Sequence, residues 1–185
     1  MADVFVRAAR LIDAGGFAAV QRRCWLADGD ELGLPPPPDA DLMERSWERA
    51  VTAPPSERHH TWVALETSSG SEVVVGAAAL APASDPDLDP STCLELLVLS
   101  VDPAHRGRGH GSRLLSAALQ TGAAAGEREA VAWLASADEL LRRFLESAGW
   151  AADGAHRTLA DDEDGPTASE LRQVRLGTLL VTSAS

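Results

Sequence analysis

The stretch that decides the fold is residues 94–119, which read LELLVLSVDPAHRGRGHGSRLLSAAL. Its first eight residues are rich in branched apolar side chains, which is typical of a buried strand. Pro103 ends that strand, because proline has no N–H to donate and its ring fixes φ. Residues 107–112 form a glycine-rich turn that runs straight into an apolar-periodic helix. The stretch therefore predicts a strand, a tight turn and a helix in direct succession.

A glycine-rich turn at a helix N-terminus is suited to binding an anion. The N–H groups of the first helical turn lack partners within the helix, and the macrodipole adds about half a positive charge there. Glycines lack a Cβ, so a phosphate can approach the backbone closely. Residues 105–113 also carry three arginines and two histidines, on a chain whose net charge is −12. We therefore expect this turn to hold a pyrophosphate. A surface turn that is glycine-rich only for tightness is the alternative.

The spacing of the motif separates three kinds of phosphate-binding turn. A dinucleotide fold would require a third glycine where Ser112 stands, and a Walker loop would require Gly-Lys-Ser/Thr, which the chain lacks. The spacing that fits is Arg106-x-x-Gly109-x-Gly111 after Val101-Asp102-Pro103. In this spacing the stretch resembles the acyl-CoA signature of the GNAT family of N-acetyltransferases, and the later elements follow in the order that this family uses.

The resemblance implies a fold. It is an α+β fold, an α/β/α sandwich whose mixed, mostly antiparallel sheet splays open where two parallel strands part. One of these strands is the one that ends at Val101, and the acyl-CoA lies in the opening. A chain of 185 residues, 45% of them hydrophobic, can bury one core. We therefore expect residues 1–185 to form a single domain.

The resemblance also implies which residues bind the cofactor. The backbone of Leu99 and Val101 would pair with the pantetheine arm like an added strand. The backbone amides of residues 106–112 would hold the pyrophosphate, with the side chains of Arg106 and Arg108 as further contacts. Asp138 stands where the family often has an asparagine that binds the pantetheine arm. The expected set is Leu99, Val101, Arg106, Gly107, Arg108, Gly109, His110, Gly111, Ser112 and Asp138.

Glu95 is the residue that we expect to act as the catalytic general base. Acyl transfer requires a neutral acceptor amine and a stabilised tetrahedral intermediate. Glu95 is the only charged residue within its apolar strand. Its place, six residues before Val101, matches the general-base glutamate of some family members. The alternative is that Glu95 lies in solvent at the mouth of the strand.

The chain departs from the family pattern at the group that protonates the leaving thiolate. Many members place a tyrosine in the last helix, but the matching residue here is Leu145, and the chain has no tyrosine. An apolar side chain would then face the thioester sulfur, so the proton would come from water or from the acceptor ammonium. Two hypotheses stay open. One is an acetyl-CoA-dependent N-acetyltransferase that acts on a primary amine by direct attack in a ternary complex. The other is a catalytically weak acyl-CoA-binding or sensing module.

Periodicity and turn residues predict the remaining elements. The four prolines of residues 35–38 predict an extended connector, and the acidic run of residues 161–166 predicts a solvated hairpin loop, with a docking site for a cationic acceptor as the alternative. Further strands are expected at residues 3–10, 61–66, 72–80, 130–135, 151–159 and 171–180. Further helices are expected from about residue 17 to Trp25, from Asp39 or Asp41 to Val51, and over residues 137–148.

Composition excludes several classes of function. A net charge of −12 argues against nucleic acids and anionic membranes as partners. Neither an apolar run near 18 residues nor a basic-then-apolar leader is present, so we expect no membrane span, no secretory signal and a cytoplasmic protein. Cys24 and Cys93, like His59 and His60, lack metal-ligand spacing, so no metal is expected. The expected partners are acetyl-CoA and an amine on a small molecule or a protein. The identity of the amine and a homodimer are left open.

Overall fold

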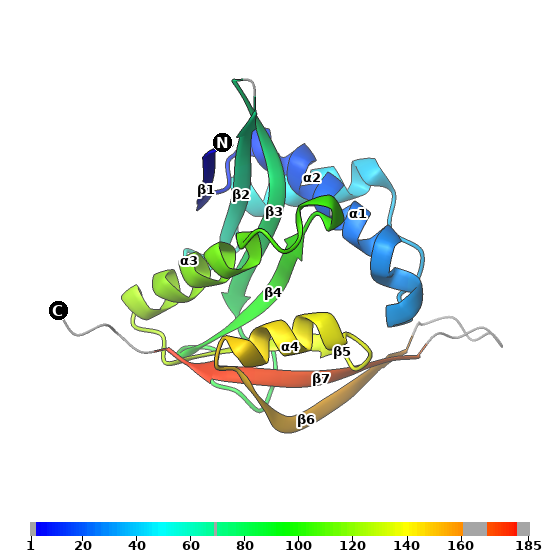
Figure 1. Cartoon of the computed structure of the whole chain (residues 1–185). Helices are drawn as coiled ribbons and strands as arrows, with labels where there is room; N and C mark the ends of the chain where they lie inside the picture. The colour runs from blue at the N-terminus through cyan, green and yellow to red at the C-terminus, as the bar shows by residue number, and fades with distance from the viewer. Residues whose placement is uncertain (1–2, 69, 161–169, 181–185) are drawn as a thin grey trace.

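The computed structural model describes residues 3–68, 70–160 and 170–180. In these residues seven strands form one sheet, in the order β1-β2-β3-β4-β5-β7-β6, with α-helices on both faces (Figure 1). The strands are β1 (Asp3–Ala8), β2 (His60–Ser68), β3 (Ser71–Pro82), β4 (Cys93–Val101), β5 (Glu129–Ala135), β6 (Ala151–Ala160) and β7 (Glu170–Leu179). The helices are α1 (Ala14–Leu32), α2 (Ala40–Thr52), α3 (His110–Ala124) and α4 (Glu139–Ser147), with the short 3-10 helices η1 (Leu11–Asp13) and η2 (Pro103–His105).

The sheet is antiparallel throughout except between β4 and β5, which run parallel. Their pairing extends only from Cys93 with Glu129 to Glu95 with Val131. Beyond that point β4 continues along β3, while β5 continues along β7, so the two strands diverge. This divergence confirms the predicted α+β fold with a mixed, mostly antiparallel and splayed sheet.

Two apolar clusters fix the helices on the two faces of the sheet. One lies beneath α3 and α4 and includes Leu94, Leu114 and Leu145. The other lies beneath α1, where Phe17 packs against Val63. Successive strand residues point to opposite faces, so β2, β3 and β4 each supply both clusters. The turn of residues 106–112, which we call the phosphate turn because a pyrophosphate is expected there, is thereby held at one end of the sheet.

The first helix differs from the sequence prediction at both ends. We expected a turn through Gly16 and a helix end at Trp25, whereas α1 runs from Ala14 to Leu32. The helix ends at Gly33, whose φ of 68° places it in the left-handed region that favours glycine. Residues after Trp25 break the apolar periodicity because they face solvent or the cavity described below. The apolar pattern therefore ended before the helix did.

Most other boundaries agree with the prediction within a few residues. The strand β1 ends at Ala8 rather than Arg10, because η1 follows it. Asp39 caps α2 by accepting hydrogen bonds from two backbone amides, and the prolines before it form the predicted connector. The acidic run of residues 161–166 lies outside the described residues. Within the described ranges, every helix is too short or too polar to cross a membrane.

The close approach of α1 to β3 depends on Gly16. A Cβ at Gly16 would lie 2.7 Å from Cγ2 of Val74, whereas a Cβ at Gly15 would meet first the flexible carboxylate of Glu44 at 2.9 Å. We predict that Gly16→Ala lowers the free energy of unfolding by about 1–3 kcal/mol, because the helix must move off the sheet. Gly15→Ala, the matched control, should be neutral or slightly stabilising. Urea unfolding measures both, and equal stability of the two variants would contradict this packing.

Candidate functional site

A cavity of about 670 Å³ opens where β4 and β5 part. This volume is typical of sites that enclose a cofactor or a small molecule. The cavity brings together most of the residues predicted from sequence: Leu99, Val101, Arg106, Gly107, Gly109, His110, Gly111, Ser112 and Asp138. Arg108 and Glu95 are not among the lining residues.

The turn before α3 has the geometry of an anion site. Gly107 and Gly109 have φ angles of 76° and 81°, which side chains with a Cβ rarely adopt. Gly109 is the N-cap of α3, and no side chain of the described chain caps this helix. The first-turn amides, which include those of Gly111 and Ser112, are thus left for a ligand at the positive end of the helix dipole.

The exposed edge of β4 presents main-chain groups to the cavity. The amide of Asp102 donates to the carbonyl of Val75 on β3, so the polar groups of its neighbour Val101 point the other way, into the gap. By strand alternation those of Leu99 point there too. The carbonyl of Val101 accepts from Cys24 Sγ at 3.2 Å and Arg106 Nε at 3.3 Å. Leu99 and the Val101 amide are therefore the groups placed to pair with an extended ligand.

Arg106 forms an ion pair that sequence analysis did not foresee. Its two terminal nitrogens bind both carboxylate oxygens of Asp28 on α1, at 3.1 and 2.5 Å. The hydrogen bond to Asp28 raises the pKa of Arg106 above its ordinary value. The positive charge of Arg106 is thus balanced by the Asp28 carboxylate. The clearest role of Arg106 is therefore to hold α1 against the phosphate turn. Asp28 lies four residues after Cys24, a helical spacing that places both on the face toward the cavity.

Asp138 faces the cavity at the N-terminus of α4. Its Oδ1 accepts a hydrogen bond from the amide of Leu141 at 2.9 Å, which caps the helix. Burial raises the pKa of the Asp138 carboxyl, and the nearby Asp28 adds to the effect, although the Leu141 hydrogen bond opposes it. With Asp28 nearby, a charged Asp138 is a second carboxylate close to any anionic ligand in the cavity. The charged form of Asp138 should therefore weaken binding of a phosphate-bearing cofactor.

Glu95 is buried, with 6% of its surface exposed, so it does not lie in solvent as the alternative supposed. Its Oε2 accepts hydrogen bonds from the Ser84 hydroxyl at 3.1 Å and, more weakly, from the Ser84 amide at 3.4 Å. Glu95 belongs to the last residue pair between β4 and β5, at the closed end of the opening. Leu97 and Trp133, two residues further along each strand, do line the cavity.

Leu145 differs from the sequence expectation. It is fully buried in the core cluster beneath α3 and α4 and is absent from the cavity lining. Leu140, Leu141 and Phe144 line the cavity instead. One residue advances a helix by about 100°, so Phe144 and Leu145 face different surroundings. Leu145 therefore faces the core and not the cavity, where a thioester was expected.

Comparison with known families agrees with this geometry. A family model described as the acetyltransferase (GNAT) family matches residues 23–150. The chain belongs to the GNAT acetyltransferase family. The matched range runs from the middle of α1 to the residue after Gly149, and it contains the phosphate turn and most of the cavity lining. No curated protein matches the chain in sequence.

Solved structures share the GNAT fold over nearly the whole chain. An N-acetyltransferase from Staphylococcus aureus Mu50 is 19% identical with a TM-score of 0.71, over 97% of this chain and 99% of that one. A phosphinothricin acetyltransferase from Sinorhizobium meliloti, solved with acetyl-CoA, is 20% identical with a TM-score of 0.71, over 96% and 88%. A GCN5-related N-acetyltransferase from Kribbella flavida is 19% identical with a TM-score of 0.69, over 96% of this chain and 98% of that one.

Replacing Asp138 tests the electrostatics of this GNAT site. Asp138→Asn keeps an oxygen that can cap α4 but removes the charge, so we predict that acetyl-CoA binds about three- to tenfold more tightly. Because the raised pKa means that the folded state holds the proton more tightly, stability should fall as pH rises through that pKa, and Asp138→Asn should lack this fall. Asp138→Ala, the control, loses the cap and about 1 kcal/mol of stability. Weaker acetyl-CoA binding by Asp138→Asn in calorimetry would contradict this view.

Replacing Leu145 tests the orientation of α4. A tyrosine would overpack the core, so we predict that Leu145→Tyr loses about 1–3 kcal/mol of stability without gaining turnover. Phe144→Tyr, the matched variant, adds its hydroxyl at the cavity and should fold normally. Thermal melting and thiol release from acetyl-CoA measure both properties. Higher turnover of Leu145→Tyr at unchanged stability would mean that residue 145 faces the thioester.

Proposed function

We propose that the protein is an acetyl-CoA-dependent N-acetyltransferase that acts on a primary amine by direct attack in a ternary complex. The observation that carries this proposal is the cavity between the diverging strands, which joins an uncapped helix N-terminus to an unpaired strand edge. The helix N-terminus suits a pyrophosphate, and the strand edge suits an extended arm that carries amides. Acetyl-CoA carries both groups.

In this proposal the pyrophosphate binds the amides of residues 107–112 and the pantetheine lies along Leu99 and Val101. The thioester then lies deeper in the cavity, toward the closed end where β4 and β5 still pair. The amine attacks the thioester carbonyl, a C–N bond forms, and the collapse of the tetrahedral intermediate breaks the C–S bond. The amine loses a proton to a base, and the thiolate gains one.

Glu95 is the proposed base, and it acts through an intervening water or hydroxyl because it does not line the cavity itself. The exposed Ser84, which donates a hydrogen bond to the Glu95 carboxylate, offers the proton a route to solvent. Leu145 supplies no hydroxyl, so the thiolate takes its proton from water or from the ammonium formed on the acceptor.

The acceptor end of the cavity favours an amine with an apolar body. Beyond the cofactor path, the lining is formed mainly by apolar side chains: Trp25, Leu32, Leu34, Leu97, Trp133 and Leu171. Gln21 and Gln173 add two side-chain amides to the cavity lining. Apolar walls stabilise apolar groups by burial and disfavour polyvalent cations. Arylalkylamines and apolar amino acids should therefore be better acceptors than polyamines.

An acyl-CoA sensor remains the second candidate, because Glu95 lies outside the cavity lining and Leu145 lies in the core. Thiol release from acetyl-CoA, measured over a panel of aromatic amines, amino acids, polyamines and protein lysines, separates the two. A transferase releases one thiol for each acetylated amine that it forms. Binding of acetyl-CoA without release for any class of amine would favour the sensor.

Replacing Glu95 tests the proposed base. We predict that Glu95→Gln lowers turnover by about 100-fold with nearly unchanged acetyl-CoA affinity, because the amide cannot take the proton. Glu72→Gln, at an exposed carboxylate of β3, is the control and should keep full turnover. Wild-type turnover and pH profile in Glu95→Gln would remove this residue from the mechanism.

A further inference from the structure

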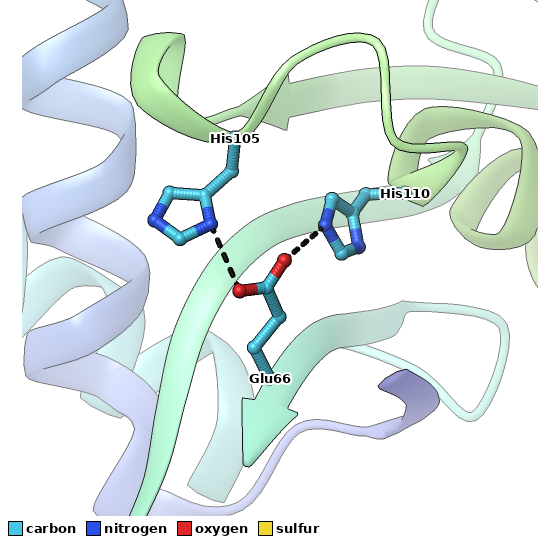
Figure 2. A group of neighbouring side chains, drawn as sticks. All are labelled: Glu66, His105 and His110. Carbon is cyan, nitrogen blue, oxygen red and sulfur yellow. Dashed lines mark hydrogen bonds and ion pairs between the residues drawn. The ribbon is translucent and has the colours of Figure 1, made fainter. Parts of the chain in front are cut away.

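Three side chains with metal-ligand chemistry meet beside the phosphate turn, as Figure 2 shows. Glu66 belongs to β2, His105 ends η2 before the turn, and His110 begins α3 after it. Glu66 Oε1 lies 2.8 Å from His110 Nε2, and Glu66 Oε2 lies 3.1 Å from His105 Nδ1. One ligand atom from each of the three lies within 4.8 Å of the others. We propose that Glu66, His105 and His110 bind a divalent transition-metal ion of the Zn²⁺ type.

The geometry of the cluster suits such an ion. Zn²⁺ takes nitrogen and carboxylate ligands at about 2.0–2.2 Å in a tetrahedron, which sets ligand atoms about 3.3 Å apart. The contact of Glu66 with His110 and that with His105 are shorter than this by a few tenths of an ångström, so both must lengthen slightly when the ion enters. Two imidazoles and one carboxylate leave a fourth position for water. The expectation of no metal rested on the spacing of Cys24, Cys93, His59 and His60, and Glu66 lies 44 residues from His110.

Burial and orientation aim the imidazole of His110 into the cluster. The side chain of His110 is fully buried, and its Nδ1 has no hydrogen-bond partner in the described chain. Its contact with Glu66 is therefore made through Nε2, which aims into the cluster.

The position of His110 argues that the cluster is more than packing. His110 lies one turn before Leu114, a fully buried member of the core. An apolar residue would fill this space without the cost of burying an imidazole and desolvating Glu66. A hydrogen-bond network that merely braces the turn is the alternative, and it requires no metal.

Arg108 is the group that a metal must displace. Its Nη1 lies 3.5 Å from both Glu66 Oε1 and His105 Nδ1, at the outer limit of a hydrogen bond. The Arg108 side chain is 55% exposed, so it can swing into solvent. Because the guanidinium competes with a cation for the same carboxylate, removing it should strengthen metal binding. This effect has the opposite sign to that of removing a ligand.

The metal would connect the cluster to the cofactor site. His105 and His110 flank residues 106–109 of the phosphate turn, and Glu66 fixes them to the sheet. An ion held by all three would immobilise the turn and preorganise its amides for an anion. We expect acetyl-CoA to bind several-fold more tightly when the metal is present, and this expectation rests on the proposed function.

The first experiment measures metal binding alone. Tag-free, chelator-treated full-length protein is titrated with Zn²⁺ by calorimetry and with Co²⁺ by visible absorption. We expect one site per chain. His105→Gln and Glu66→Gln should each weaken binding by at least about tenfold, and Arg108→Gln should strengthen it. His156→Gln, at an exposed histidine of β6, is the control and should change nothing. The partly exposed His105 is replaced instead of His110, because a variant of the buried residue risks misfolding.

The second experiment titrates acetyl-CoA with and without Zn²⁺ in the wild type and in His105→Gln. Tighter binding with Zn²⁺ in the wild type alone supports the coupling. Wild-type Zn²⁺ affinity in His105→Gln, or no binding at all, would overturn the metal site and leave the hydrogen-bond network. Zn²⁺ binding that leaves acetyl-CoA affinity unchanged would overturn the coupling. Acetyl-CoA is also titrated in the presence of chelator, without any metal. Loss of binding there would count against the proposed function and not against the metal site.

Discussion

The rest of this structure depends on the early end of the parallel pairing between β4 and β5. After Glu95 and Val131 the two strands follow different neighbours, so the sheet must open. An open sheet would normally leave unpaired main-chain groups exposed, which is unfavourable unless a partner satisfies them. Here Cys24 and Arg106 satisfy the carbonyl of Val101, and the edge at Leu99 remains for a ligand. The fold thereby creates a site at the point where its own hydrogen bonding is incomplete.

The charges around the cavity favour binding of an anion by backbone amides. The chain carries a net charge of −12, and the arginine that leads the motif is already paired with Asp28. Asp138 adds a further carboxyl at the cavity, with a pKa raised by burial. Besides the exposed side chains of Arg108 and Arg113, the groups that can attract an anion are the amides of the turn and the dipole of α3, which contribute positive potential without a mobile side chain. Glycines at 107 and 109 are required because only their backbone conformation presents those amides.

Sequence analysis predicted the parts of the site that are local in the chain. The strand, proline, glycines and helix follow one another within 26 residues, so their chemistry and order fix the turn. The predicted end of α1 was wrong, because the last turns of this helix carry no apolar stripe. Asp28 and Glu66 were missed because they meet the turn only after the chain has folded, 78 and 42 residues away from Arg106 and Arg108. The orientation of Leu145 was missed because a family motif gives its position along α4 but not the face that this helix turns to the core.

The central claim is that acetyl-CoA adds to the free edge of β4 and binds the amides of the following turn. Amide hydrogen–deuterium exchange with and without acetyl-CoA tests it most directly, because it reports on those N–H groups one segment at a time. We predict slower exchange in residues 97–101 and 107–112, with little change in residues 93–95, which already pair with β5. Protection confined to other strands, or unchanged exchange in both segments at saturating acetyl-CoA, would contradict the account.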